Sequence, residues 1–266
     1  MFKNILLSIY KNSNILHYPK RFTMKKITDI YNKNQSGGGE RELNITYKDH
    51  IYKFQESQID DNHFILYTLD DTELECISIL IDIESQQAEL HGISNYESCL
   101  RFTNTKVGST LLKITLKMLK KYKDKLRIKF IILTDNSIKK CNNHDIKLSN
   151  MLILLSGHTW YGKYGFRPYK DNYAINRYEK NIEIMINITI SDANILKYIK
   201  LTKNNDLIKS TKRLLKEQPE FLLKKYLSNL LSNYNETCNY FYLFYNELFN
   251  DIGLYNFHKY VFILEL

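Results

Sequence analysis

The sequence lacks the features of a membrane-spanning or secreted chain. No apolar run in its 266 residues approaches the roughly 18 residues that a membrane-spanning helix needs. The first apolar cluster, Ile5-Leu6-Leu7, is too short for the central region of a signal peptide, and no small-residue cleavage site follows it. We therefore expect neither a membrane span nor a signal peptide.

Cysteine is also scarce. The four cysteines, Cys76, Cys99, Cys141 and Cys238, are scattered and form no C-x-x-C pair. This spacing argues against a disulfide framework or a zinc site, and it favours a reducing, intracellular setting. Cys141 and His144 form a single C-x-x-H pair, and without a second pair we expect no bound metal.

Alanine and proline each occur at only three positions, whereas Lys, Asn, Ile and Tyr are abundant. This bias is typical of an AT-rich coding sequence, which is one explanation for the formal net charge of +9. The other explanation is an anionic partner, such as nucleic acid or a phosphorylated cofactor. Hydrophobic residues make up 44% of the chain and charged residues 25%, which indicates a globular protein with a sizeable core.

The flexible stretch Gln35–Gly39 is the best domain boundary in the sequence. Residues 1–43 are expected to form an N-terminal extension that includes this linker. Residues 44–190 are expected to form the core. Residues 191–266, with helical patterns between positions 195 and 249 and a strand-like end, are expected to form a mainly helical C-terminal extension.

The core begins with alternating patterns that predict an antiparallel meander. Turn residues such as Asp70-Asp71 separate the strands. The predicted strands cover residues 45–47, 51–54, 64–67, 76–81 and 88–94.

A helix and a central strand follow the meander. Apolar residues recur at helical spacing from Val107 to Tyr122, with hydroxyl and amide side chains at the N-terminus. Residues 127–134 are nearly all apolar, as in a strand covered on both faces. A second apolar helical stripe runs from Leu148 to Leu155, and residues 181–190 alternate strictly enough to predict a further strand.

The stretch Thr159-Trp160-Tyr161-Gly162-Lys163-Tyr164-Gly165-Phe166 is the most informative in the sequence. Its aromatic residues fall at helical spacing, Gly165 suits a left-handed stop, and Pro168 prevents the helix from resuming. The stretch therefore predicts a helix end that fixes Tyr161 on its last turn. An aromatic helix end that only packs into a core gives the same pattern.

The motif Tyr-x-Lys-x-Gly-Phe, at residues 161–166, closely resembles the end of the fourth helix in GCN5-related N-acetyltransferases (the GNAT superfamily). The order of the predicted elements over about residues 45–190 also resembles that core. The resemblance implies an α+β fold with a mixed, mostly antiparallel sheet and helices on both faces. It also implies an acetyl-CoA-dependent transfer of an acetyl group to a primary amine, without a metal.

In this family the loop before the long helix binds the pyrophosphate of acetyl-CoA through backbone N–H groups at the helix N-terminus. Here the matching run is residues 103–108, in which only Gly108 of the usual glycines is kept and Lys106 replaces the first one. The resemblance also implies a cofactor contact by Asn136. The implied cofactor-binding residues are Thr105, Lys106, Val107, Gly108, Ser109, Thr110 and Asn136.

The resemblance implies that Tyr161 gives a proton to the departing thiolate. Glu89 and His91 alternate onto one face of a predicted strand, so either could take the proton of the substrate ammonium, or both could simply face solvent. The acceptor is an amine of a small molecule, a lysine side chain or a chain terminus.

Two alternatives stay open. The altered phosphate loop and the long helical extension also fit a catalytically inactive structural or interaction protein with the same fold. The lysines between positions 113 and 125 could bind nucleic acid, but they alternate with the apolar stripe, which favours a solvated helix face. The composition further resembles uncharacterised acetyltransferase-like proteins of giant DNA viruses, which implies host cytoplasm or a virus particle as the location.

Overall fold

The fold is known from a computed structural model of the chain. It describes residues 42–94, 96–102, 106–141, 144–169, 171–234 and 240–266. Residues 1–41 of the predicted N-terminal extension, Thr105 and Cys238 lie outside these residues, and the last two residues of that extension, Glu42 and Leu43, belong to a strand. The described chain divides into two compact units: residues up to Ile131 together with Leu266, and residues Ile132–Glu265. The fold class is α+β with a mostly antiparallel sheet, as predicted.

The first unit contains the predicted meander. Its strands pair in sequence order, each antiparallel to the next, and every second side chain is buried on one face. The strands are β1 (Glu42–Tyr47), β2 (His50–Gln58), β3 (His63–Leu69), β4 (Glu75–Asp82) and β5 (Gln87–Ile93).

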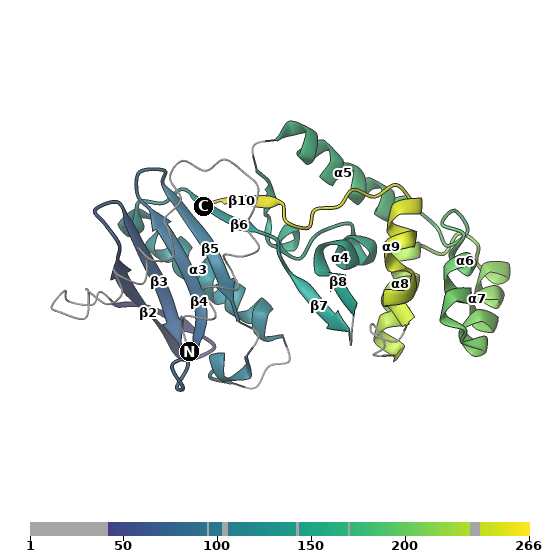
Figure 1. The fold of residues 1–266 in the computed structure, drawn as a ribbon, viewed down its shortest axis with the longest axis horizontal. Helices are drawn as coiled ribbons and strands as arrows, with labels where there is room; N and C mark the ends of the chain where they lie inside the picture. Colours follow the sequence, from purple (N-terminus) through teal and green to yellow (C-terminus); the bar gives the residue numbers. More distant parts are fainter. Residues whose placement is uncertain (1–41, 95, 103–105, 142–143, 170, 235–239) are drawn as a thin grey trace. The chain divides into compact units, whose positions relative to one another are not determined.

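The helix α3 (Val107–Leu126) packs on this meander, as Figure 1 shows. Its predicted apolar stripe is buried, and the left-handed Arg127 ends it with φ 54°. Beside this stripe, Lys117 and Lys121 donate hydrogen bonds to the carbonyls of Thr46 (2.8 Å) and Asn44 (3.2 Å) in β1. Two of the lysines between positions 113 and 125 therefore make hydrogen bonds within the protein.

A disulfide in the first unit corrects the prediction from cysteine spacing. Cys76, in β4, is bonded to Cys99, in the short 3-10 helix η1 (Glu97–Cys99). Cys141, in the second unit, is disulfide-bonded as well. Sequence spacing failed here because the meander brings together cysteines that are 23 positions apart in sequence.

The strand β6 (Phe130–Thr134) contains the division between the two units. In the second unit, β10 (Val261–Glu265) lies between β6 and β9 (Arg167–Pro168) and runs antiparallel to β9. The predicted C-terminal strand is thus confirmed. A separate hairpin, β7 (Ile138–Cys141) and β8 (His144–Lys147), follows β6.

Helices make up most of the second unit, and α4 (Leu148–Ser156) packs against α5 (Asn172–Asn187), α8 (Leu223–Tyr234) and α9 (Tyr242–Asp251). The predicted helical C-terminal region is confirmed. The remaining elements are the 3-10 helix η2 (Tyr161–Tyr164), α6 (Ile195–Ile199), η3 (Lys200–Thr202) and α7 (Asn205–Glu217).

The predicted strand at residues 181–190 is wrong, because most of this segment is the second half of helix α5. Asp171 caps the helix by accepting a hydrogen bond from the Tyr173 amide at 2.9 Å. The buried residues then follow helical spacing: Ala174, Tyr178, Asn181 and Met185. None of the helices in the described parts of the chain is long and apolar enough to cross a membrane.

Candidate functional site

Tyr161 opens a short 3-10 helix, separate from the longer helix before it. The longer helix, α4, ends at the left-handed Gly157 (φ 78°). The 3-10 helix ends at Gly165 (φ 94°), so the predicted glycine stop is confirmed. The ring of Tyr161 contacts the rings of Trp160 and Phe166, with centroid separations of 4.8 Å and 6.0 Å. Tyr161 is thus held by aromatic packing on a single tight turn.

The position of this turn is fixed by the absence of a side chain at Gly162. The Gly162 amide donates to Thr159 Oγ1 at 3.1 Å. A Cβ atom at this position would lie 1.7 Å from the hydroxyl oxygen of Tyr178. Tyr178 is fully buried, its ring lies edge-on to Phe257, and its hydroxyl is 3.3 Å from His158 Nδ1. Only glycine fits this close approach.

Asp135 is a buried carboxylate beside Tyr161 that sequence reasoning missed. It follows strand β6 and is 0% exposed. Its Oδ1 accepts hydrogen bonds from the amide and the hydroxyl of Ser137, whereas its Oδ2 is buried without a hydrogen-bond partner. Burial raises the pKa of Asp135 above its ordinary value, although the bonds from Ser137 oppose this shift.

Asp135 and burial act together on Tyr161. Burial, and then the negative charge of Asp135, raise the pKa of the Tyr161 phenol well above its ordinary value. Tyr161 therefore keeps its proton across the physiological range. A thiol has a pKa near 8.5, so this phenol can donate a hydrogen bond to a developing thiolate but does not give up its proton to a free one.

The first unit places the two predicted proton acceptors on the same face of β5. Glu89 Oε2 lies 3.5 Å from His91 Nε2. Burial alone would raise the pKa of Glu89, but the hydrogen bond and charge of His91 hold it below its ordinary value. Glu75, in β4, also feels the charge of His91, yet burial raises its pKa. Two carboxyl groups around one imidazole thus have pKa values shifted in opposite directions, a pattern found in acid–base sites.

The predicted phosphate-binding residues lie at the N-terminus of α3. Lys106 is the N-cap residue, and the first turn (Val107–Thr110) holds no acidic side chain. The first N–H groups of a helix have no intrahelical partner and carry a partial positive charge. This helix end therefore suits a phosphate. Thr105 lies outside the described residues, and Asn136 is exposed just after β6.

Both residues of the C-x-x-H pair make other interactions. Cys141 and His144 are paired residues of the β7–β8 hairpin. The thiol of Cys141 is consumed in a disulfide, and the His144 ring stacks on Tyr242 at a centroid separation of 4.7 Å. Neither side chain is placed for a joint metal site.

Comparison with known proteins gives no match. No protein-family model, no curated protein and no solved structure matches this chain. The function must therefore be inferred from the residues and their geometry.

Proposed function

We propose that the protein is an N-acetyltransferase that transfers an acetyl group from acetyl-CoA to a primary amine. The observation that carries this proposal is the Tyr161 phenol, which is fixed on a glycine-bounded turn and kept protonated by burial and by Asp135. The succession of a meander, the helix α3, the strand β6 and this turn supports the same activity.

The residues of α3 fit the anionic part of acetyl-CoA. Lys106 supplies a cation, and the amides of the first turn supply hydrogen-bond donors without a nearby acidic side chain. Acetyl-CoA supplies the activated acetyl group as a thioester. Its diphosphate would be held by residues 106–110.

The chain's own groups manage the protons. Glu75 accepts the proton of the substrate ammonium, because a carboxyl group with a raised pKa is a better base near neutral pH. Glu89 and His91, on the neighbouring strand, are the alternative acceptors. The Tyr161 hydroxyl donates a hydrogen bond to the sulfur as negative charge develops there. Asp135 acts indirectly, because its charge disfavours the tyrosinate form of Tyr161.

Cofactor binding is tested by thermal unfolding with acetyl-CoA and with CoA. A ligand at 100 times its dissociation constant stabilises the folded state by about 2.7 kcal/mol. For a chain of this size that corresponds to a rise in Tm of about 5–10 °C. An unchanged Tm with both ligands would contradict the proposal.

The catalytic role is tested by Tyr161→Phe, with Tyr164→Phe as the matched control in the same turn. The Phe ring keeps the contacts with Trp160 and Phe166 and removes only the hydroxyl. Turnover with a panel of amines should fall by about 10²–10⁴-fold for Tyr161→Phe, while the Tm shift with acetyl-CoA should persist. Equal activity of the two variants would remove Tyr161 from the mechanism.

A second candidate is a protein that uses the same scaffold for structure or interaction, without catalysis. The observation that favours it is Lys106 at the position where the family has its first glycine, because a side chain there restricts how closely a diphosphate approaches the backbone. This candidate predicts no Tm shift with acetyl-CoA or CoA and no turnover with any amine.

A further inference from the structure

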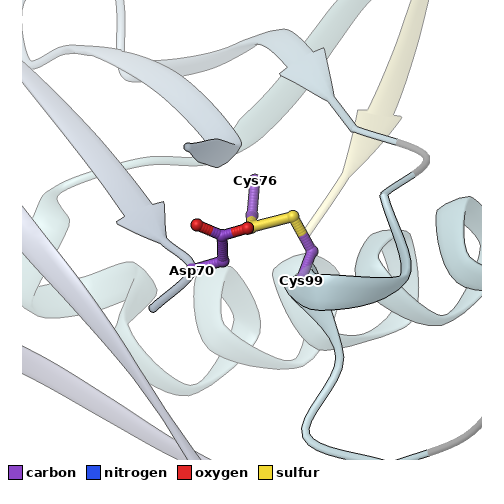
Figure 2. Close-up of side chains that lie close together, drawn as sticks. All are labelled: Asp70, Cys76 and Cys99. Carbon is purple, nitrogen blue, oxygen red and sulfur yellow. A yellow bond between two sulfur atoms is a disulfide. The ribbon is translucent and has the colours of Figure 1, made fainter. Parts of the chain in front are cut away.

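Three potential metal donors come together in the first unit. Figure 2 shows the carboxylate of Asp70 beside the sulfur atoms of Cys76 and Cys99. One carboxylate oxygen and the two Sγ atoms all lie within 4.8 Å of one another. Asp70 comes from the turn between β3 and β4, Cys76 from β4 and Cys99 from η1. In this structure the two sulfur atoms are joined in the disulfide.

The two oxygen atoms of Asp70 have different environments. Oδ1 holds the turn, because it accepts hydrogen bonds from the amides of Thr72 (2.8 Å) and Leu74 (2.9 Å). Oδ2 is buried and receives no hydrogen bond of normal geometry, although the Ser98 hydroxyl is near enough to stabilise the charged carboxylate. A buried carboxylate oxygen without a hydrogen bond is an unusual feature. It has the capacity to bind a cation.

The cluster can be reached from solvent. A pocket of about 440 Å³ is lined by Asp70 and Cys99, together with Arg101 and His50. Both cysteines are buried, and only Cys99 is among the residues that line the pocket. The pocket therefore brings solvent next to two of the three residues of the cluster.

We propose that Asp70, Cys76 and Cys99 form a redox-controlled binding site for zinc or a similar divalent cation. Two thiol groups of a reductant supply two electrons and two protons, so the Cys76–Cys99 bond breaks and a disulfide forms in the reductant. The cation then displaces the two thiol protons and is bound by two thiolates and the carboxylate. In the reverse direction a disulfide-bearing oxidant accepts the two electrons and leaves as two thiols, the Cys76–Cys99 bond forms again, and the cation is released.

The donor set and its spacing suit zinc. Zinc binds thiolate at about 2.3 Å and carboxylate at about 2.0–2.2 Å in tetrahedral geometry, which places neighbouring donor atoms about 3.5–3.8 Å apart. Donors that already lie within 4.8 Å of one another need only small side-chain rotations to reach this spacing. Three ligands leave the fourth position open for water or a ligand from the pocket.

The test uses the full chain, reduced with dithiothreitol and freed of it without oxygen, and compared with the oxidised chain. Zinc binding is measured by competition with a chromophoric chelator. Cobalt is used in parallel, because thiolate ligands give charge-transfer absorption. The reduced chain should bind one zinc ion at this site, and the oxidised chain should bind none there. If reduction unfolds the first unit, zinc should restore the fold; a reduced chain that neither binds zinc nor refolds with it overturns the proposal.

Matched variants separate this site from other donors. Asp70→Asn keeps one side-chain oxygen for the turn and replaces only the second one with an amide nitrogen. Loss of a group that merely hydrogen-bonds a metal ligand lowers metal affinity by about 10–100-fold. Loss of a ligand atom should therefore lower zinc affinity by at least about 100-fold. Asp71→Asn, in the same turn, should leave affinity unchanged. The double variant Cys76→Ala/Cys99→Ala keeps the other two cysteines and should lose the site. Equal zinc affinity in the double variant and the wild type, or in the Asp70→Asn and Asp71→Asn variants, overturns the proposal.

Discussion

Replacing Gly162 by alanine tests the geometry of the Tyr161 turn without any assumption about activity. The new Cβ would lie 1.7 Å from the hydroxyl oxygen and 3.0 Å from Cζ of Tyr178. Tyr178 cannot move away easily, because it is fully buried with its ring edge-on to Phe257 and Phe262. The Gly162→Ala variant must therefore shift a packed aromatic side chain.

The expected cost follows from three contributions. Overpacking of a well-packed core costs about 1–3 kcal/mol. Displacing the Tyr178 hydroxyl from His158 (3.3 Å) loses a hydrogen bond that contributes about 0.5–1.5 kcal/mol. The backbone of Gly162 does not lie at positive φ, so alanine recovers about 0.4–1 kcal/mol by restricting the unfolded chain. The free energy of unfolding should fall by about 2 kcal/mol.

The chain carries its own probe for this measurement. Trp160, the single tryptophan of the sequence, lies next to Tyr161 and contacts its ring. Its fluorescence during urea unfolding reports on the unit that contains the turn. Gly92→Ala is the control, because its new Cβ meets only Glu75 Oε1, at 3.9 Å. Gly92 lies in the first unit, so the urea unfolding of this variant is followed by circular dichroism, and its free energy of unfolding should change by less than about 1 kcal/mol.

A double-mutant cycle decides whether the clash is the cause. In a Tyr178→Phe background the hydroxyl that Gly162→Ala would strike is absent, so the alanine should cost at least about 1 kcal/mol less than in the wild type. If Gly162→Ala costs the same in both backgrounds, or costs nothing in the wild type, the reasoning about this turn is refuted.

Three further predictions concern the buried polar groups and the disulfide. Burial raises the pKa of Asp135 in the folded state. The contribution of this group to the free energy of unfolding is therefore fully present below the unfolded pKa of about 3.9, and it is lost as pH rises through the folded pKa. Asp135→Asn should therefore become more stable relative to the wild type as pH rises from acid to neutral. If the difference between the two free energies of unfolding, measured with urea, does not change with pH, this prediction is contradicted. Removing the disulfide by Cys76→Ala/Cys99→Ala, across a sequence separation of 23, should lower the free energy of unfolding by about 3 kcal/mol, measured against the oxidised wild type. Asn181→Ala leaves a backbone amide and a backbone carbonyl without the 2.8 Å hydrogen bonds that the amide side chain makes, so urea unfolding should show a loss of about 2–5 kcal/mol; a loss below about 1 kcal/mol would mean that water replaces the side chain.

Local periodicity predicted the first unit well. Strand alternation from Ile45 onward and the helical stripe that begins at Val107 both reflect a single buried face, and the structure buries these faces. The end of the turn at Gly165 was also predicted, because the left-handed residue that ends a helical turn is usually glycine.

Periodicity failed where two patterns overlapped. Isoleucine at every second position from Ile182 to Ile190 predicted a strand. The helix begins ten residues earlier, at Asn172, and its buried stripe through Tyr178 and Met185 carries the helical phase into this segment. The alternating isoleucines are not equally buried, since Ile186 is 49% exposed. Reading from the capping residue Asp171 would have given the correct phase.

The candidate sites depend on contacts that the sequence does not reveal. The prediction placed a functional amide at Asn136, which is exposed, whereas the adjacent Asp135 is the buried group. An Asp-x-Ser sequence directly after an apolar strand was the available signal, because it often forms a side-chain turn. The donors Asp70, Cys76 and Cys99 come from three separate elements, so no short motif could have indicated a metal site.

The two α3 lysines bonded to β1 have a consequence for self-association. An unpaired outer strand is the usual place where a second molecule adds to a sheet. The carbonyls of Asn44 and Thr46 already accept hydrogen bonds from Lys121 and Lys117. An incoming strand would have to displace both ammonium groups before it could use these carbonyls. The helix α3 therefore protects the outer edge of β1 from pairing with another chain. Neutralising the two lysines should make the protein more prone to polymerise.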